Sequence, residues 1–178
     1  MAIPLILGVY YVPGDWLSLS EQNTVAATLF IIAALTDWFD GYLARTLGQT
    51  SAFGAFLDPV ADKLMVAAVL TILLQLDRVD AFIAAIIIGR EITISALREW
   101  MALLGNPKSV AVSFVGKLKT TAQLIALPLL LLSDRWIGPV SCFDAGTVLI
   151  YIAAALTLIS MAYYLRRAGP FLKTTLDG

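Results

Sequence analysis

Four aspartates between residues 37 and 62 are the side chains in this sequence most suited to chemistry. Asp37 and Asp40 are three residues apart, and Asp58 and Asp62 are four residues apart. Side chains at these spacings share one face of a helix, so each pair presents two carboxylates together. Two such pairs form an all-oxygen ligand set of the kind that hard divalent cations such as Mg²⁺ or Mn²⁺ prefer.

The residues that the chain lacks narrow the chemistry further. It contains no histidine and one cysteine, so the usual general base, the usual zinc ligand and an internal disulfide are excluded. Acid–base work must fall to carboxylates, lysine or tyrosine. The net charge of -1 gives no basic field for nucleic acid, and we expect no nucleic-acid partner.

Small residues and one arginine accompany the aspartates. Gly41 follows Asp40, and Gly54 lies one helical turn before the second pair. Missing side chains let a ligand approach the backbone. Ala44 keeps the same region small, and Arg45 offers a bidentate fork for phosphate. A single aspartate or glycine would indicate only interfacial solvation or close helix packing, but the joint pattern favours a binding site.

The composition shows what must hold these residues. The chain is 60% hydrophobic and 14% charged, against about 25% charged for soluble domains. We therefore expect an integral membrane protein. Apolar segments long enough to cross a ~30 Å hydrocarbon core run over 24–45, 52–76, 81–104, 110–132 and 147–165. Backbone groups in lipid must be satisfied internally, so these segments should be helices.

The opening segment, 1–12, is shorter than the others. We interpret it as the second half of a transmembrane helix whose beginning is missing, with an interfacial segment as the alternative. The predicted fold is all-α: a single domain over 1–178, built as an integral membrane bundle of six transmembrane helices with a truncated first helix.

Because the connections near Arg45, 90–119 and 166–173 hold most basic residues, they should be cytoplasmic, as should both termini. The aspartates then lie at the cytoplasmic ends of the second and third helices, which should be antiparallel neighbours.

The aspartate segment also resembles a known family. Asp-x-x-Asp-Gly-x-x-Ala-Arg from residue 37, followed by Gly-x-x-x-Asp-x-x-x-Asp from residue 54, matches every signature position of the CDP-alcohol phosphatidyltransferases. The resemblance implies a membrane enzyme of six transmembrane helices, commonly a homodimer. Such an enzyme transfers a phosphatidyl group from CDP-diacylglycerol to an alcohol and releases CMP.

The segments GREITISALREW at 89–100 and SVAVSFVGKLKTTAQ at 109–123 resemble the bacterial branch that uses glycerol 3-phosphate as acceptor. This implies phospholipid biosynthesis at the bacterial inner (cytoplasmic) membrane, with the active site facing the cytoplasm. The family's first helix usually opens with an Asn-Leu-Thr-x-x-Arg-like segment. This chain starts after it, and we expect a truncated start.

The resemblance assigns roles to the residues above. It implies two divalent ions, Mg²⁺ or Mn²⁺, held by Asp37, Asp40, Asp58 and Asp62. It implies that Asp62 also serves as the catalytic base. It places the donor, CDP-diacylglycerol, against Gly41, Ala44, Arg45 and Gly54.

The acceptor phosphate needs a basic pocket, and four cations are candidates for it: Arg90, Lys117, Lys119 and Arg98. Cations inside apolar segments are rarely without a function. Two alternatives stay open: the lysines could be ordinary cytoplasmic anchors, and Arg90 could form a structural pair with Glu91 or Glu99.

Two other functions compete with this interpretation. A membrane metal-ion carrier would be expected to show repeat symmetry, whereas all four aspartates lie in one stretch. A sister transferase could use inositol phosphate, serine or a phosphatidyl lipid as acceptor, and the aspartate motif does not separate these. The basic cluster favours a phosphorylated acceptor.

Overall fold

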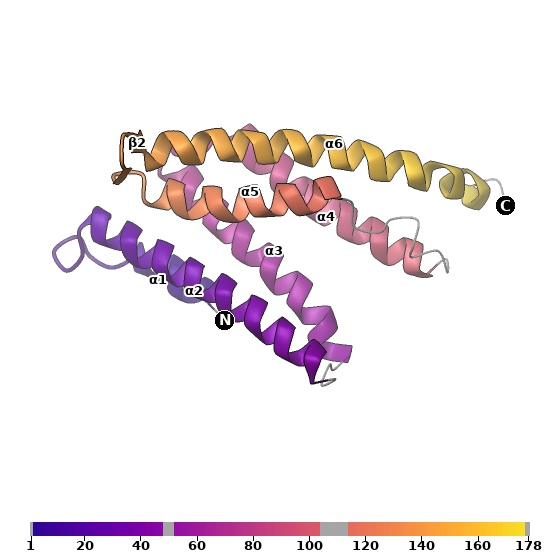
Figure 1. Ribbon diagram of the computed structural model, residues 1–178, viewed down its shortest axis with the longest axis horizontal. Coiled ribbons are helices and arrows are strands. Elements are labelled where there is room, and N and C mark those ends of the chain that lie inside the picture. The colour runs from indigo at the N-terminus through magenta and orange to yellow at the C-terminus, as the bar shows by residue number, and fades with distance from the viewer. Residues whose placement is uncertain (1, 48–51, 104–113, 177–178) are drawn as a thin grey trace.

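The computed structural model describes residues 2–47, 52–103 and 114–176, with side chains described in these ranges except at 44–45, 52–59, 114–115, 117 and 167–176. These ranges contain six helices and one short hairpin (Figure 1). The helices are α1 (Ile3–Val9), α2 (Leu19–Thr46), α3 (Ala52–Gln75), α4 (Ala81–Leu103), α5 (Phe114–Leu131) and α6 (Cys142–Leu176). The strands are β1 (Trp136–Ile137) and β2 (Val140–Ser141), paired antiparallel around Gly138, whose φ of 62° suits glycine.

The predicted helices are confirmed, with shifts at their ends. α2 begins at Leu19, earlier than hydrophobicity alone predicted, because Ser18 and Glu21 form a capping box. The Glu21 carboxylate accepts the Ser18 backbone N–H at 2.8 Å, which satisfies a donor at the helix start. α6 begins at Cys142 and carries Asp144 in its first turn, where a negative charge suits the helix dipole.

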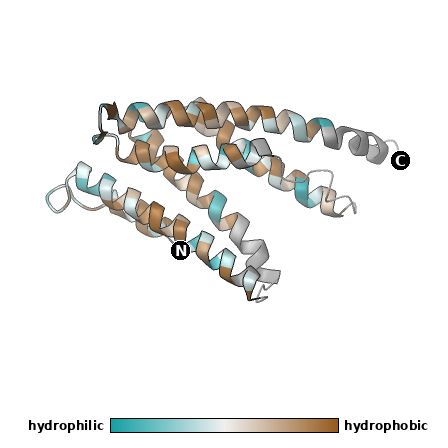
Figure 2. Cartoon of the chain, in the orientation of Figure 1, coloured by the Kyte–Doolittle hydropathy of each residue, from teal (hydrophilic) through white to brown (hydrophobic). Residues whose placement is uncertain are grey.

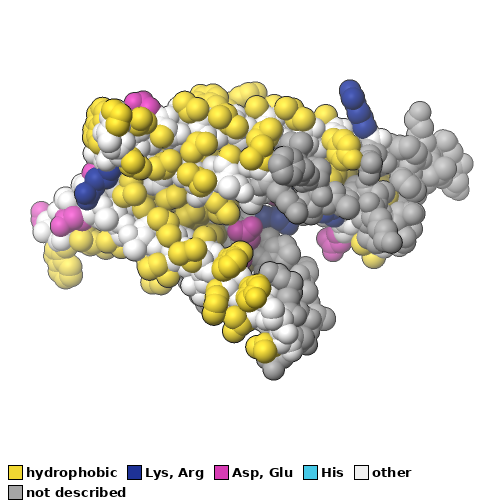
Figure 3. Space-filling model, in the orientation of Figure 1, with side chains coloured by type: hydrophobic (Ala, Val, Ile, Leu, Met, Phe, Trp, Pro, Cys, Tyr) yellow, Lys and Arg dark blue, Asp and Glu magenta, His cyan; other side chains and the backbone are white. Residues whose placement is uncertain are grey.

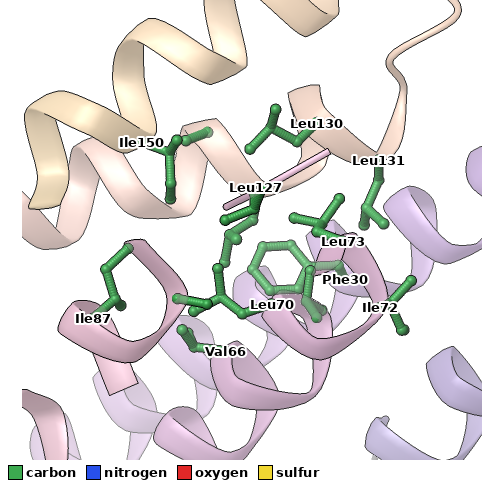
Figure 4. Packing of buried hydrophobic residues seen from close by; sticks show 14 of the residues in the cluster. Phe30, Val66, Leu70, Ile72, Leu73, Ile87, Leu127, Leu130, Leu131 and Ile150 are labelled. Atoms are coloured by element: carbon green, nitrogen blue, oxygen red, sulfur yellow. The ribbon is translucent and has the colours of Figure 1, made fainter. Parts of the chain in front are cut away.

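A shared apolar core joins α2, α3, α4, α5 and α6 (Figure 4). Phe30 of α2 lies among Leu70 and Leu73 of α3, with Leu127 of α5 and Ile150 of α6 on the other side. All five side chains are at most 2% exposed. Lipid is as apolar as this core, so in a bilayer close van der Waals packing of these side chains holds the helices together. The core therefore fixes the relative positions of the helices that carry the charged residues.

The helix neighbours differ in part from the expectation. α2 and α3 run antiparallel and approach each other where α2 ends and α3 begins (Figure 1), but along their described lengths they are not packed neighbours: α1 packs against both, and α2 packs against α5. α4 packs against α3 and α6. α5 and α6 approach so closely that a Cβ on Gly146 would lie 2.8 Å from Leu130 Cγ. Helices α3, α4, α5 and α6 can thus bring their polar residues into one region.

Hydrophobic residues make up much of the helices (Figure 2), and apolar side chains cover much of the face seen in Figure 3. Leu35 is 61% exposed, Phe82 71% and Ile159 59%. An apolar exterior of this extent is typical of a protein that faces lipid. Within the described residues, two helical stretches, Leu19–Leu43 and Cys142–Arg166, are long and apolar enough to cross a membrane. The finding is a membrane-compatible helical bundle.

Candidate functional site

Three of the four aspartates line one cavity. Asp37 and Asp40 lie in the last third of α2, and Asp62 lies just before the middle of α3. All three border a cavity of about 450 Å³ whose remaining lining is mostly apolar and includes residues of α1. Because α2 and α3 converge at this end, carboxylates from the two helices reach the same space. This is the convergence that the spacing of the aspartates predicts.

Several predicted site residues have side chains outside the described residues. The backbones of Asp58 and Gly54 lie in α3, those of Ala44 and Arg45 in α2, and that of Lys117 in α5. Gly41 is described and directly follows Asp40 within α2. The roles assigned to these residues stay predictions.

The carboxylates fit a divalent cation in chemical type. Asp37, Asp40 and Asp62 supply only oxygen donors, and they share one cavity. Among the described side chains, no three acidic, histidine or cysteine residues lie close enough to enclose one ion. Asp58, the fourth predicted ligand, lies outside those side chains. Its position four residues before Asp62 puts it on the same face of α3.

A second cavity, of about 250 Å³, is also bordered by Asp62. It is lined by residues of α3, α4 and α5, most of them charged. Four cations face two carboxylates there, an excess of two positive charges: Lys63, Arg90, Arg98 and Lys119 against Asp62 and Glu91. We call this space the basic pocket. Figure 3 shows acidic and basic side chains side by side in a hollow of the otherwise apolar surface.

Glu91 holds two of these cations. Its Oε1 accepts from the Lys119 ammonium and, at 3.3 Å, from Arg90 Nη1. Arg90 is 7% exposed and Lys119 2% exposed, and cations buried to this extent need a counter-charge. The pairing of Arg90 with Glu91, left open by the sequence, is therefore observed. The pair with Glu91 uses one of the five N–H donors of the Arg90 guanidinium, so Arg90 can still bind a ligand in the pocket.

Two residues of α6 contact the arginines of the basic pocket, and the sequence did not indicate them. Arg90 Nη2 donates to Ser160 Oγ at 3.0 Å, and Arg98 Nη2 donates to the Tyr164 hydroxyl at 3.1 Å. Both guanidinium groups also lie over the Tyr164 ring. Neither α6 residue is charged, so neither stood out within an apolar segment. Their spacing of four residues, which places two polar groups on one face, was the available signal.

Asp62 borders both cavities. On one side it shares space with Asp37 and Asp40, and on the other with the cations of α4 and α5. It lies within electrostatic range of Asp37 and Glu91 and of Lys63 and Lys119. A carboxylate in this position can contact two reactants, one in each cavity.

Comparison with known proteins identifies the family. The sequence profile of the CDP-alcohol phosphatidyltransferases matches residues 1–159, most of the chain. The chain belongs to this family. CDP-alcohol phosphatidyltransferases are enzymes that transfer phosphatidyl groups, and they generally depend on divalent metal ions. Membership therefore favours an enzyme over a metal-ion carrier.

Curated relatives place the chain within the family. It is 49% identical over 168 residues to the CDP-diacylglycerol--glycerol-3-phosphate 3-phosphatidyltransferase of Salmonella choleraesuis (strain SC-B67). It is 48% identical over the same length to the protein of that name from Escherichia coli (strain K12). Each comparison covers 93% of this chain and 87% of the relative. No solved structure matches the chain significantly.

Proposed function

We propose that this CDP-alcohol phosphatidyltransferase transfers the phosphatidyl group of CDP-diacylglycerol to glycerol 3-phosphate, giving phosphatidylglycerophosphate and CMP. The relatives of 48–49% identity carry the name of this reaction. The observation that carries the proposal is the position of Asp62 between an acidic and a basic cavity. A diphosphate donor that needs metal ions suits the first, and a phosphorylated acceptor suits the second.

The acidic cavity receives the donor in this proposal. Asp37, Asp40, Asp58 and Asp62 would hold two divalent ions, Mg²⁺ or Mn²⁺. Bound there, such ions would supply charge stabilisation for the diphosphate and for the departing CMP. The donor would also lie along Gly41, Ala44, Arg45 and Gly54, where small side chains leave room and the guanidinium can pair with phosphate.

The basic pocket receives the acceptor. The excess of two positive charges among its lining residues matches the charge of a phosphate dianion. Arg90, Arg98 and Lys119 are the described cations that would bind it, joined by Lys117. Serine or glycerol would leave this charge uncompensated in a partly buried site, which disfavours them as acceptors.

Asp62 takes the proton in the reaction. The acceptor hydroxyl oxygen bonds to the phosphorus that carries the diacylglycerol, and the bond from that phosphorus to the oxygen of CMP breaks. The hydroxyl proton passes to the Asp62 carboxylate as general base. A carboxylate is a weak base, so holding both reactants in position must supply much of the rate.

We extend the proposal to the membrane. The apolar exterior and the two long apolar helices support a multi-pass protein, with the charged half of α4 and the start of α5 at the cytoplasmic surface. Six spans, both termini and the active site on the cytoplasmic side, and residence in the bacterial inner membrane follow from the distribution of basic residues and from the bacterial relatives. The family likeness also favours a homodimer.

The test is an acceptor panel with the purified full chain, CDP-diacylglycerol and Mg²⁺. We expect CMP release that requires glycerol 3-phosphate and that is far slower with glycerol, serine or inositol phosphate. Asp15→Asn, an exposed aspartate of the α1–α2 connection, is a control for purification and should keep full activity. Equal rates of CMP release with acceptors that carry a phosphate and acceptors that lack one would assign the chain to a sister reaction. The absence of CMP release with every acceptor would refute the transferase.

A further inference from the structure

A single buried tyrosine contacts two arginines of the basic pocket. Tyr164 of α6 is 0% exposed. The guanidinium carbon of Arg98 lies 5.3 Å from its ring centroid, and that of Arg90 lies 5.8 Å from it. The Tyr164 hydroxyl accepts from Arg98 Nη2 at 3.1 Å. One side chain on α6 thus contacts two cations from α4.

The arginines need such a support. Two guanidinium groups against the same ring repel each other, and both side chains are long and flexible. The Nε atoms of Arg90 and Arg98 are buried without a hydrogen-bond partner among the described residues. Their fixed contacts are made at the terminal nitrogens, where α6 supplies Tyr164 and, one turn earlier, Ser160. A buried aromatic face attracts cations more strongly than an exposed one, and both Tyr164 and Arg90 are buried.

We propose that Tyr164 is a positioning residue for the acceptor: it holds Arg90 and Arg98 side by side in the basic pocket so that both can meet one phosphate. The inference rests on the proposed function. It gives α6 a role in substrate recognition through the arginines, without contact between Tyr164 and the substrate. A purely structural role is the competing account, because Tyr164 also packs with Ile94 and Met101.

Two substitutions separate the contributions of the ring and the hydroxyl. Tyr164→Phe keeps the ring under both arginines and removes the hydrogen bond to Arg98. Tyr164→Leu removes both. We expect KM for glycerol 3-phosphate to rise about 3- to 10-fold in the first variant and further in the second, with KM for CDP-diacylglycerol within about twofold of wild type. Tyr151→Phe, an exposed tyrosine of the same helix, should change neither.

A double-mutant cycle provides the decisive measurement. Because the hydroxyl acts on Arg98, Tyr164→Phe should add no further increase in KM for glycerol 3-phosphate once Arg98→Gln is present. A structural role would instead lower the thermal midpoint and would lower kcat/KM for both substrates together. In that case the effects of Tyr164→Phe and Arg98→Gln would add. This outcome would overturn the inference. Should Tyr164→Leu fail to fold, the phenylalanine variant and the cycle still decide.

The two levels of the proposal fail in different ways. If wild type shows no glycerol-3-phosphate-dependent CMP release, both the proposed function and the role of Tyr164 are refuted. If Arg90→Gln and Arg98→Gln raise KM for glycerol 3-phosphate while both tyrosine variants keep the wild-type value, the function stands and the role of Tyr164 is refuted.

Discussion

Arg78 and Asn23 are joined by a 3.2 Å hydrogen bond at the end of the bundle opposite the aspartates, although 55 residues separate them. Arg78 Nη1 also donates to the backbone oxygens of Leu130 and Leu131, at 3.2 and 2.8 Å. Tyr10 donates to the same Asn23 side chain at 3.1 Å. The α3–α4 turn, α2 and the end of α5 are thereby fixed to one guanidinium.

Replacing Arg78 should therefore destabilise the bundle and spare the chemistry. Arg78→Met leaves two carbonyl groups at the end of α5 without this donor and removes one of the two bonds to the Asn23 amide oxygen, at a cost of about 2–4 kcal/mol. Thermal unfolding of the detergent-solubilised protein measures this. The KM values of the folded enzyme should stay at wild type. Arg135→Met is the matched control, because Arg135 is exposed and its bond to Thr24 should contribute less than about 1 kcal/mol.

Glu91 should matter most when the basic pocket is empty. Glu91→Gln removes the negative charge shared by Arg90 and Lys119, so the buried cations lose their counter-charge and the thermal midpoint should fall. A bound phosphate can replace that charge. Inorganic phosphate should hence raise the midpoint of the variant more than that of wild type, with chloride at equal ionic strength as control. Equal shifts in the two proteins would mean that phosphate binds elsewhere.

Each of the four aspartates should be required for phosphatidyl transfer. Replacing Asp37, Asp40, Asp58 or Asp62 with asparagine should abolish transfer and leave the protein in the membrane, because each neutral amide removes a charged ligand. For Asp62→Asn, loss of the general base alone predicts a fall in kcat of about 10²- to 10⁴-fold. CMP release from membranes with matched protein amounts is the assay. Wild-type turnover in two of the four variants at ordinary Mg²⁺ would contradict the metal-site assignment.

Removal of divalent ions should stop the reaction reversibly. The carboxylate ligands predict that EDTA abolishes CMP release and that Mg²⁺ or Mn²⁺ restores it. Dialysed enzyme that is titrated with each ion gives the measurement. Zn²⁺ should restore little, since the ligand set holds no histidine or cysteine. Full activity after exhaustive chelation would exclude a metal-dependent mechanism.

The pocket cations should act on the acceptor and not on the donor. Arg90→Gln, Lys117→Gln and Lys119→Gln each remove a charge-assisted contact of roughly 1.5–3 kcal/mol. This corresponds to about a 10- to 150-fold loss in kcat/KM for glycerol 3-phosphate. Steady-state kinetics with each substrate varied in turn is the measurement. If the variants lose affinity for CDP-diacylglycerol and keep normal acceptor kinetics, the basic pocket belongs to the donor.

The helices and the aspartates were predictable from the sequence because their signals are local. Long apolar segments indicate helices without knowledge of their neighbours, and the spacing of Asp37 and Asp40 places both on one face. The start of α2 was missed, although Ser18 and Glu21 have the spacing of a capping box, because hydrophobicity was given more weight.

The contacts between distant segments could not be predicted in this way. Tyr164 meets Arg98 across 66 residues, and Arg78 reaches the end of α5 across more than 50. Nothing near Tyr164 in the sequence indicates an arginine partner, since packing of α4 against α6 creates the contact. The pairing of Arg90 with Glu91 was among the alternatives because the two residues are adjacent, whereas the sharing of Glu91 with Lys119 required the fold.

The place of Asp62 between two cavities has a kinetic consequence. Donor and acceptor occupy separate spaces in the proposed reaction, so neither has to leave before the other binds. Transfer then proceeds in a ternary complex by one direct displacement, and phosphorus undergoes inversion of configuration. No phosphatidyl-enzyme forms, and labelled CMP should exchange into CDP-diacylglycerol only when glycerol 3-phosphate or the phosphatidylglycerophosphate made from it is present.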